Sequence, residues 1–107
     1  MASLAPLVTR YSYYELDIDV PSAGVKRNRH LVRMTRLEFQ LLRYFVDHRG
    51  ATLSRDELSR EVWGYSGSAI SRTVDMHVAK LRQKIEADPR NPQRILTIVG
   101  SGYKFVG

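Results

Sequence analysis

The chain has 107 residues, 43% of them hydrophobic, which is enough for one buried core, so we expect one domain rather than two. A formal net charge of +6 favours a polyanionic partner such as nucleic acid or an anionic membrane, although a need for solubility explains such a charge equally well. The absence of cysteine excludes disulfides and thiolate metal sites. No apolar run reaches the ~18 residues of a membrane span and the first residues lack the basic start of a secretory signal, so we expect a cytoplasmic protein.

The first predicted elements are strands. Residues 1–10 resemble a linker or a cloning remnant, so the domain is expected to cover 11–107. Apolar and acidic side chains alternate at the end of residues 11–20, which predicts one half-buried strand. A PSAG turn follows, and residues 25–34 predict a hairpin that turns at Arg27 and Asn28. The N-terminal part is therefore predicted to be a small antiparallel sheet.

Two capping boxes predict the next two elements to be helices. In TRLE, the Thr35 hydroxyl accepts from the backbone N–H of Glu38 and the glutamate side chain reaches back to the cap. A first helix is expected over 35–49, with Gly50 as its stop. SRDE repeats the motif and predicts a second helix over 54–63.

A third helix is predicted over 69–87. At ~100° per residue its apolar residues fall in one stripe, which must be buried. That stripe holds Ile70, Val74, Val78, Leu81 and Ile85. The opposite side holds Arg72, Met76, Ala79, Lys80 and Gln83, with Thr73 and Lys84 close by and His77 and Arg82 on the two flanks.

The last predicted element is a β-hairpin over 94–106, turning at GSG. The order of elements predicts an α+β fold, a winged helix-turn-helix with a small N-terminal antiparallel sheet, three helices and a C-terminal hairpin as the wing.

Catalysis has little support in the sequence. His30, His48 and His77 are scattered over different elements, and nothing near them suggests a metal cluster or a nucleophile–base pair. VGSGYK lacks the strand–loop–helix setting of a phosphate-binding loop. We therefore expect neither enzyme activity nor a metal or other cofactor.

The third helix suggests binding of double-stranded DNA, because a helix fits the major groove and Arg72 and Lys80 can reach guanine or phosphate. On its own this face favours an ordinary solvated helix, and the hairpin that follows reverses that preference, because an isolated C-terminal hairpin needs something to contact. The basic KRNRH stretch, with Arg33 and Arg36, either extends the charged surface or is merely exposed.

Two other kinds of binding compete with this interpretation. The aromatic side chains of Tyr11, Tyr13 and Tyr14 either stack single-stranded bases or, more commonly, complete a sheet core. A winged helix can also dock proteins, such as RNA polymerase, and bind DNA only non-specifically. That protein-interaction module is the principal alternative.

Three motifs resemble one known family: LEFQLL in the first helix, RTVDMHVAKLRQKI in the third, and GSGYKF in the hairpin. From about Tyr11 onward the chain is similar to the OmpR/PhoB-type winged-helix DNA-binding effector domain of two-component response regulators. The resemblance implies a bacterial transcription factor that binds promoter DNA, usually as a head-to-tail pair on direct repeats. It also implies a receiver domain, which these residues do not include, and a cognate histidine kinase.

The resemblance also implies roles for particular residues. Family positions that touch DNA correspond here to Arg72, Thr73, Met76, His77, Lys80 and Arg82 on the third helix, and to Thr97 and Tyr103 in the wing. Lys84 is expected to contact phosphate. Val99 stands where some members carry a minor-groove arginine, and Lys104 or Arg94 would have to compensate.

The connector after the second helix contacts RNA polymerase in some members of that family. Its counterparts here are Trp63, Gly64, Tyr65, Ser66 and Gly67. The isolated domain is expected to be a monomer off DNA, because a domain this small leaves little apolar surface for a standard interface.

Overall fold

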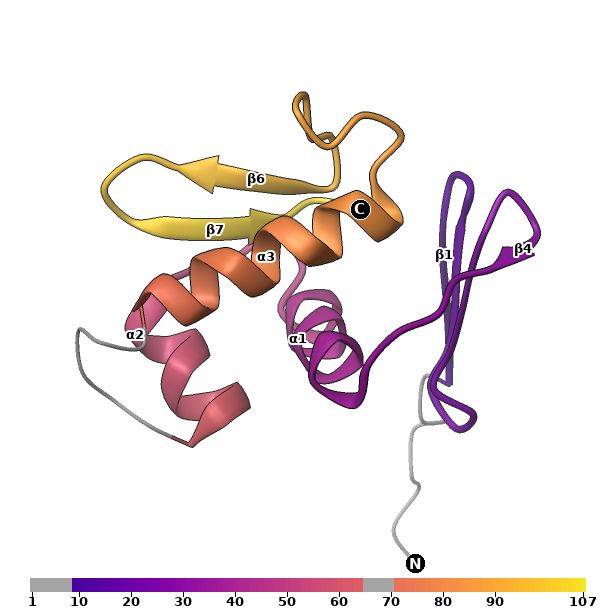
Figure 1. Ribbon diagram of the computed structural model, residues 1–107, viewed down its shortest axis with the longest axis horizontal. Coiled ribbons are helices and arrows are strands. Elements are labelled where there is room, and N and C mark those ends of the chain that lie inside the picture. The colour runs from indigo at the N-terminus through magenta and orange to yellow at the C-terminus, as the bar shows by residue number, and fades with distance from the viewer. Residues whose placement is uncertain (1–8, 65–70) are drawn as a thin grey trace, which may run out of the picture.

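The N-terminal segment forms a four-stranded antiparallel sheet in the computed structural model, which describes residues 9–64 and 71–107. Strands β1 (Arg10–Tyr13), β2 (Leu16–Asp19), β3 (Gly24–Arg27) and β4 (His30–Leu31) pair in the order of the sequence (Figure 1). Because side chains alternate along a strand, Leu16 and Ile18 are buried on one face of the sheet. Arg10 already belongs to β1, so the boundary expected after residue 10 falls inside the first strand.

The single strand predicted for 11–20 is wrong, because the chain reverses in the middle of it. Tyr14 has a φ of 57°, and the residues on either side of the turn pair as β1 and β2. The next hairpin turns at Asn28 (φ 52°) and Arg29 (φ 67°), one residue later than predicted. Left-handed turn residues of this kind match the twist of a two-residue hairpin but leave no trace in hydrophobic periodicity.

Two helices begin at the two predicted caps, α1 (Arg36–Asp47) and α2 (Arg55–Leu58). At α1 the capping box is complete, since Thr35 and Glu38 exchange both hydrogen bonds. At α2 the Ser54 hydroxyl accepts from the backbone N–H of Glu57, but the Glu57 carboxylate accepts from the Tyr44 hydroxyl at 2.6 Å. The second box therefore caps its helix from one side and ties α2 to α1 from the other.

The second helix changes pitch along its length. Residues 54–63 were predicted as one helix, whereas the structure divides them into α2 and a π-helical segment, η1 (Ser59–Trp63). Gly64 ends η1 in the left-handed conformation, with a φ of 80°, a geometry in which glycine carries no steric penalty.

The C-terminal part comprises α3 (Ser71–Ile85) and a three-stranded sheet of order β5-β7-β6. Its strands are β5 (Thr52–Leu53), β6 (Ile95–Ile98) and β7 (Gly102–Phe105). The hairpin β6–β7 is the wing, and β5 was not anticipated because two residues are too short to show a period. Gly102 has a φ of +137°, and a Cβ there would lie 2.0 Å from the carbonyl oxygen of Leu53, so only glycine fits between β7 and β5.

The core lies between the helices and the two sheets. Val74, Val78, Leu81 and Ile85 are fully buried, as the stripe on the third helix predicted, while Ile70 lies outside the described residues. In Figure 1, α3 runs above α1, with the wing alongside α3 and the N-terminal sheet at the other end of the molecule. This architecture confirms the predicted winged helix-turn-helix. No helix among the described residues is long and apolar enough to cross a bilayer.

Candidate nucleic-acid interface

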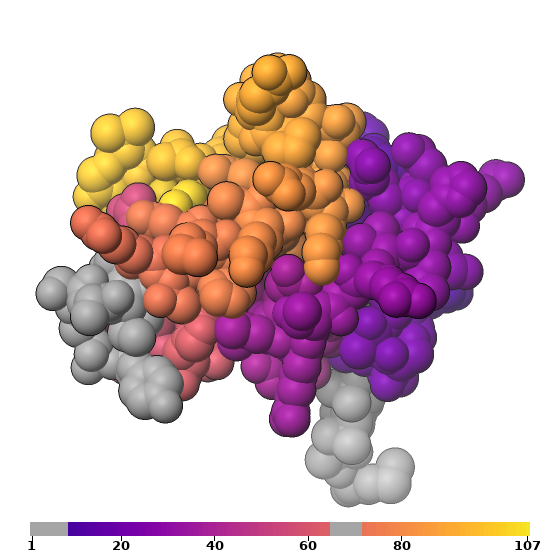
Figure 2. Space-filling view, in the orientation of Figure 1, coloured from indigo at the N-terminus to yellow at the C-terminus, as the bar shows by residue number. Residues whose placement is uncertain are grey.

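The outer face of α3 is open to solvent. Arg72, Met76, Ala79, Lys80 and Gln83 are all exposed, Met76 by 56%. Figure 2 shows α3 uncovered along one face of the molecule, between the wing and the N-terminal sheet. Within the described part of the chain, neither Arg72 nor Lys80 forms a hydrogen bond or an ion pair with another residue. Two cations with no partner among the described residues and an exposed thioether therefore lie along this face.

One flank of α3 is engaged by α1 and η1. The Nδ1 atom of His77 lies 2.8 Å from the carbonyl oxygen of Thr73, and the imidazole meets the Trp63 ring edge-on with the centroids 5.2 Å apart. Lys84 Nζ lies 2.5 Å from Glu38 Oε1, within the capping box of α1. Lys84 was expected to contact a DNA phosphate, and the structure instead gives its charge a partner inside the protein.

The other flank of α3 is joined to the wing through Arg82. Its Nη2 donates to the carbonyl oxygen of Ile95 at 2.8 Å and to Thr97 Oγ1 at 2.9 Å, and its Nε donates to the same carbonyl at 3.1 Å. The guanidinium also lies 5.3 Å from the centroid of the Tyr103 ring. Arg82 therefore holds the wing in place, and Thr97 remains exposed on its surface.

Tyr103 was expected to reach the DNA backbone, but its side chain is packed between α3 and the wing. Only 5% of it is exposed, and its hydroxyl donates to Asp75 Oδ1 at 2.6 Å. Arg55 Nε donates to the same oxygen at 2.7 Å. Burial, and then the hydrogen bond to Asp75, raise the pKa of Tyr103 above its ordinary value. Asp75 and Arg55 were not predicted as site residues, because an acidic residue on a helix expected to bind DNA does not itself suggest a binding role.

The tip of the wing is apolar. Val99 is 92% exposed, and Lys104 is half-buried on β7. Arg94 was named as a possible replacement for a wing arginine, but its Nη2 donates to Glu15 at 2.9 Å and its Nη1 to the carbonyl oxygen of Gly107 at 3.1 Å. Since these bonds hold Arg94 at the base of the wing, it does not supply a cation at the tip.

The basic stretch of the N-terminal sheet is mostly exposed. Arg27 Nη1 donates to the carbonyl oxygen of Glu86 at 3.1 Å, which ties β3 to the end of α3. The remaining basic residues of this region are open to solvent: Lys26, Arg29, His30, Arg33 and Arg36.

Two of the three N-terminal tyrosines belong to the packing of the sheet. The Tyr11 hydroxyl donates to Asp47 Oδ1 at 3.1 Å, and the Tyr13 ring meets Phe105 edge-on at 5.2 Å. Tyr14, at the β1–β2 turn, is 86% exposed. The arrangement favours the sheet-core interpretation of these tyrosines over a stacking row for single-stranded bases.

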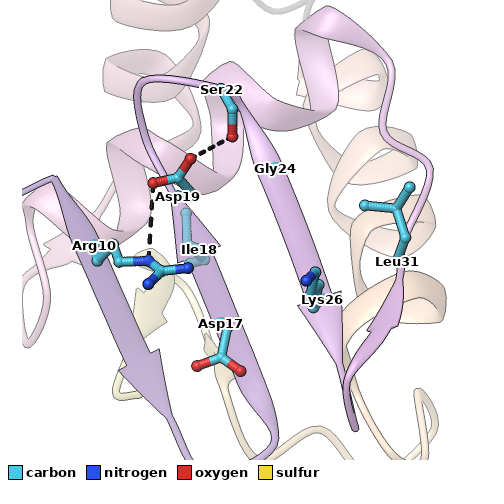
Figure 3. A pocket seen from close by; sticks show the side chains of 8 residues that line it. All are labelled: Arg10, Asp17, Ile18, Asp19, Ser22, Gly24, Lys26 and Leu31. Carbon is cyan, nitrogen blue, oxygen red and sulfur yellow. Dashed lines mark hydrogen bonds and ion pairs between the residues drawn. The ribbon is translucent and has the colours of Figure 1, made fainter.

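A shallow hollow lies on the outer face of the N-terminal sheet, and its Arg10, Asp19 and Ser22 side chains contact one another (Figure 3). Asp19 accepts a hydrogen bond from Ser22 and lies 3.8 Å from Arg10 Nε. The other residues that line the hollow are Asp17, Ile18, Gly24, Lys26 and Leu31. Nowhere in the described residues do three or more His, Cys, Asp or Glu side chains group so that they could hold a metal.

The predicted polymerase-contact loop is only partly described. Trp63 closes η1 and packs on His77, and Gly64 follows it. Tyr65, Ser66 and Gly67 lie outside the described residues.

Comparisons with known proteins agree with this geometry. The family model described as "Transcriptional regulatory protein, C terminal" matches residues 28–105. The DNA-binding response regulator MtrA of Mycobacterium leprae is 44% identical over 93 residues, which cover 87% of this chain and 41% of MtrA. The chain spans about two fifths of the length of the curated relatives it matches, 37% to 41%.

Two solved structures share the fold. The response regulator DrrB of Thermotoga maritima, an OmpR/PhoB homologue, superposes with a TM-score of 0.85 at 30% identity, covering 92% of this chain and 45% of DrrB. The DNA-binding domain of Klebsiella pneumoniae RstA, in complex with the RstA box, gives 0.84 at 27% identity and covers 92% and 98%. The chain therefore belongs to the family of C-terminal domains of transcriptional regulatory proteins, in the OmpR/PhoB-type winged-helix form.

Proposed function

We propose that the chain binds double-stranded DNA sequence-specifically, as the effector domain of a two-component response regulator that controls transcription. The observation that carries the proposal is the outer face of α3, where Arg72 and Lys80 have no partner in the described part of the protein and Met76 is exposed. The RstA structure, a domain of this fold in complex with its DNA box, supports the same use of the fold here.

In this proposal α3 enters the major groove. The Arg72 guanidinium can donate two hydrogen bonds to O6 and N7 of a guanine, and Met76 offers apolar contact to a thymine methyl group. Lys80 presents a single compact charge, so it suits phosphate or one base acceptor better than a bidentate contact. Thr73 and His77 lie at the edge of the same face, where the sugar-phosphate backbone that borders the groove would pass.

The wing is proposed to follow an adjacent stretch of backbone. Thr97 is exposed, and Lys104 lies on the neighbouring strand, so both are candidates for phosphate contact. At the tip, Val99 offers no positive charge to the strong negative potential of a narrow minor groove. We therefore expect this domain to show less preference for A-tracts beside its site than a relative with arginine at that position.

Selection of bound duplexes from a random DNA library at near-physiological salt tests the proposal. The best duplex and a scrambled one are then titrated. Enrichment of a short motif, repeated about one helical turn apart, is the result we expect. Equal and steeply salt-dependent binding to both duplexes would instead mean that α3 only attracts phosphate, as in the protein-interaction alternative.

The whole protein is proposed to carry more than this domain. Because the chain spans only two fifths of its curated relatives, a receiver domain and a cognate histidine kinase are expected partners. A cytoplasmic location follows from promoter DNA as the target. Contact of the connector after Trp63 with RNA polymerase, the absence of enzyme activity, and a monomeric state off DNA complete the proposal.

A further inference from the structure

We propose that Asp75 is a positioning residue for DNA binding: it ties the wing to α3 and so sets the orientation at which the two elements meet the duplex. The inference rests on the proposed function, because it concerns how that same surface is held together. Asp75 itself need not touch DNA.

The carboxylate of Asp75 is engaged on the wing side of α3. Its Oδ1 accepts from the Tyr103 hydroxyl at 2.6 Å and from Arg55 Nε at 2.7 Å. These partners come from β7 and from the first turn of α2, so one oxygen joins three elements. Because Arg55 neutralises the carboxylate, a negative charge can sit beside a surface that binds a polyanion.

A second joint lies farther along the same flank. Arg82 is seven residues after Asp75, roughly 10 Å along the helix axis. It donates to the carbonyl oxygen of Ile95 and to Thr97 Oγ1, both on β6. The pairing of β7 with β5 holds one edge of the wing, and the Asp75 joint fixes β7 against α3. Two joints at separate points, one on each strand of the hairpin, define the direction of the wing relative to α3.

The Tyr103 ring connects the two joints. The guanidinium carbons of Arg55 and Arg82 each lie 5.3 Å from its centroid, within the range of a cation–π contact. Next to it, Gly102 packs against the backbone of Leu53, which immediately precedes the cap of α2. The phenol therefore lies where β7, α2 and α3 meet, and its hydroxyl donates to the Asp75 carboxylate.

The experiment measures the distance between α3 and the wing directly. Since the chain has no cysteine, Gln83→Cys and Ser101→Cys introduce the only two thiols, one on the exposed face of α3 and one at the wing turn. Spin labels on this pair report the distance distribution in the free protein by pulsed electron resonance. Asp75→Asn and Tyr103→Phe are compared with the parent in this labelled background. The same variants without the two cysteines are titrated with the selected duplex and a scrambled one.

A similar trio elsewhere in the fold supplies the control. The Tyr11 hydroxyl donates to Asp47, whose other oxygen lies 3.7 Å from Arg43 Nε. Asp47→Asn and Tyr11→Phe make the same chemical changes at the exposed side of α1, away from the wing. They should leave both the α3–wing distance and the preference for the selected duplex unchanged.

We expect both joint variants to broaden the distance distribution. The ratio of specific to non-specific affinity should fall about tenfold or more, the size of a lost hydrogen bond to a charged group. Binding to the scrambled duplex should not fall in Asp75→Asn, because the change removes a negative charge. Unchanged distances, or a loss of affinity for both duplexes in equal proportion, would overturn the proposal. If the parent prefers no duplex, the proposed function fails, whereas the distances in free protein still decide whether Asp75 holds the wing.

Discussion

Arg72 is the side chain best placed to read a base, because it is exposed at the start of the outer face of α3 and has no partner in the described residues. Arg72→Ala should cost ~1–3 kcal/mol of discrimination at one or two base pairs if the contact is bidentate. Titration against duplexes with single base-pair changes measures this.

Lys26→Ala is the control for that experiment. It removes one exposed charge from the N-terminal sheet, away from α3, and should leave base preference intact. If Arg72→Ala weakened binding to every duplex by the same factor, Arg72 would contact phosphate rather than bases.

Lys84 illustrates how a basic residue on a promising helix can serve the fold. Its partner Glu38 is buried and also caps α1, so Lys84→Ala should lower the free energy of unfolding by about 1–2 kcal/mol. Urea unfolding at neutral pH checks the loss. In Lys84→Ala the slope of log K for DNA binding against log salt concentration should stay the same. A slope about one unit shallower would mean that Lys84 contacts a phosphate.

The same pair predicts a pH dependence. Burial acts to raise the pKa of Glu38, but hydrogen bonds from Lys84 and Thr35 outweigh it and hold the pKa below its ordinary value of 4.5. A lowered pKa contributes stability that is present above 4.5 and lost as the pH falls through the folded-state value. Lys84→Ala should therefore lose less stability on acidification than the parent. Parallel losses in urea unfolding at pH 7 and at acid pH would contradict the linkage.

Among the elements, the wing depends most on a single backbone position. Gly102→Ala should destabilise the protein by about 2–4 kcal/mol, because φ is +137° and the new Cβ would collide with the carbonyl of Leu53. Gly100→Ala is the matched control, since φ is +76° and nothing lies within 4 Å of its Cβ, leaving only the ~1–2 kcal/mol cost of the left-handed conformation. Equal losses in urea unfolding would show that β5 does not hold the wing.

The elements also show which parts of the fold can be read from sequence. The described part of the α3 stripe and the two cap residues, Thr35 and Ser54, follow from local rules and are confirmed, although the box at Ser54 forms only its hydroxyl half. The β1–β2 turn at Tyr14 and the two-residue β5 could not be found, because a positive φ and a short edge strand depend on tertiary contacts rather than on periodicity. The outer face of α3 was predictable for the same reason as its stripe.

Side-chain partners were the least predictable part of the site. Lys84 and Tyr103 look like free contact residues in the sequence, yet each is engaged by a residue from another element. Such pairings depend on segments far apart in the chain, so neither spacing nor composition reveals them.

At the scale of the whole molecule, Glu86 links the N-terminal sheet, the end of α3 and the wing. It is 2% exposed and accepts from the backbone N–H groups of Gln93, Arg94 and Ile95, while its own carbonyl accepts from Arg27. Glu86→Ala would leave three N–H groups without an acceptor, and should cost about 2–4 kcal/mol in thermal or urea unfolding.

The control for Glu86 is Glu61→Ala, which removes an exposed carboxylate 3.6 Å from Arg60. Exposed ion pairs contribute little, so its effect should stay within about 0.5 kcal/mol. A Glu86 variant as stable as this control would mean that the N–H groups of Gln93, Arg94 and Ile95 do not depend on the Glu86 carboxylate.

The central claim is that α3 reads base edges in the major groove, and modified duplexes test it most directly. In the selected site, 7-deazaguanine removes the major-groove N7 acceptor, while inosine in place of guanine removes only the minor-groove amine. We predict that 7-deazaguanine at one or two positions lowers the affinity of the parent but not of Arg72→Ala, and that inosine has little effect. Loss of affinity with inosine and none with 7-deazaguanine would contradict the account.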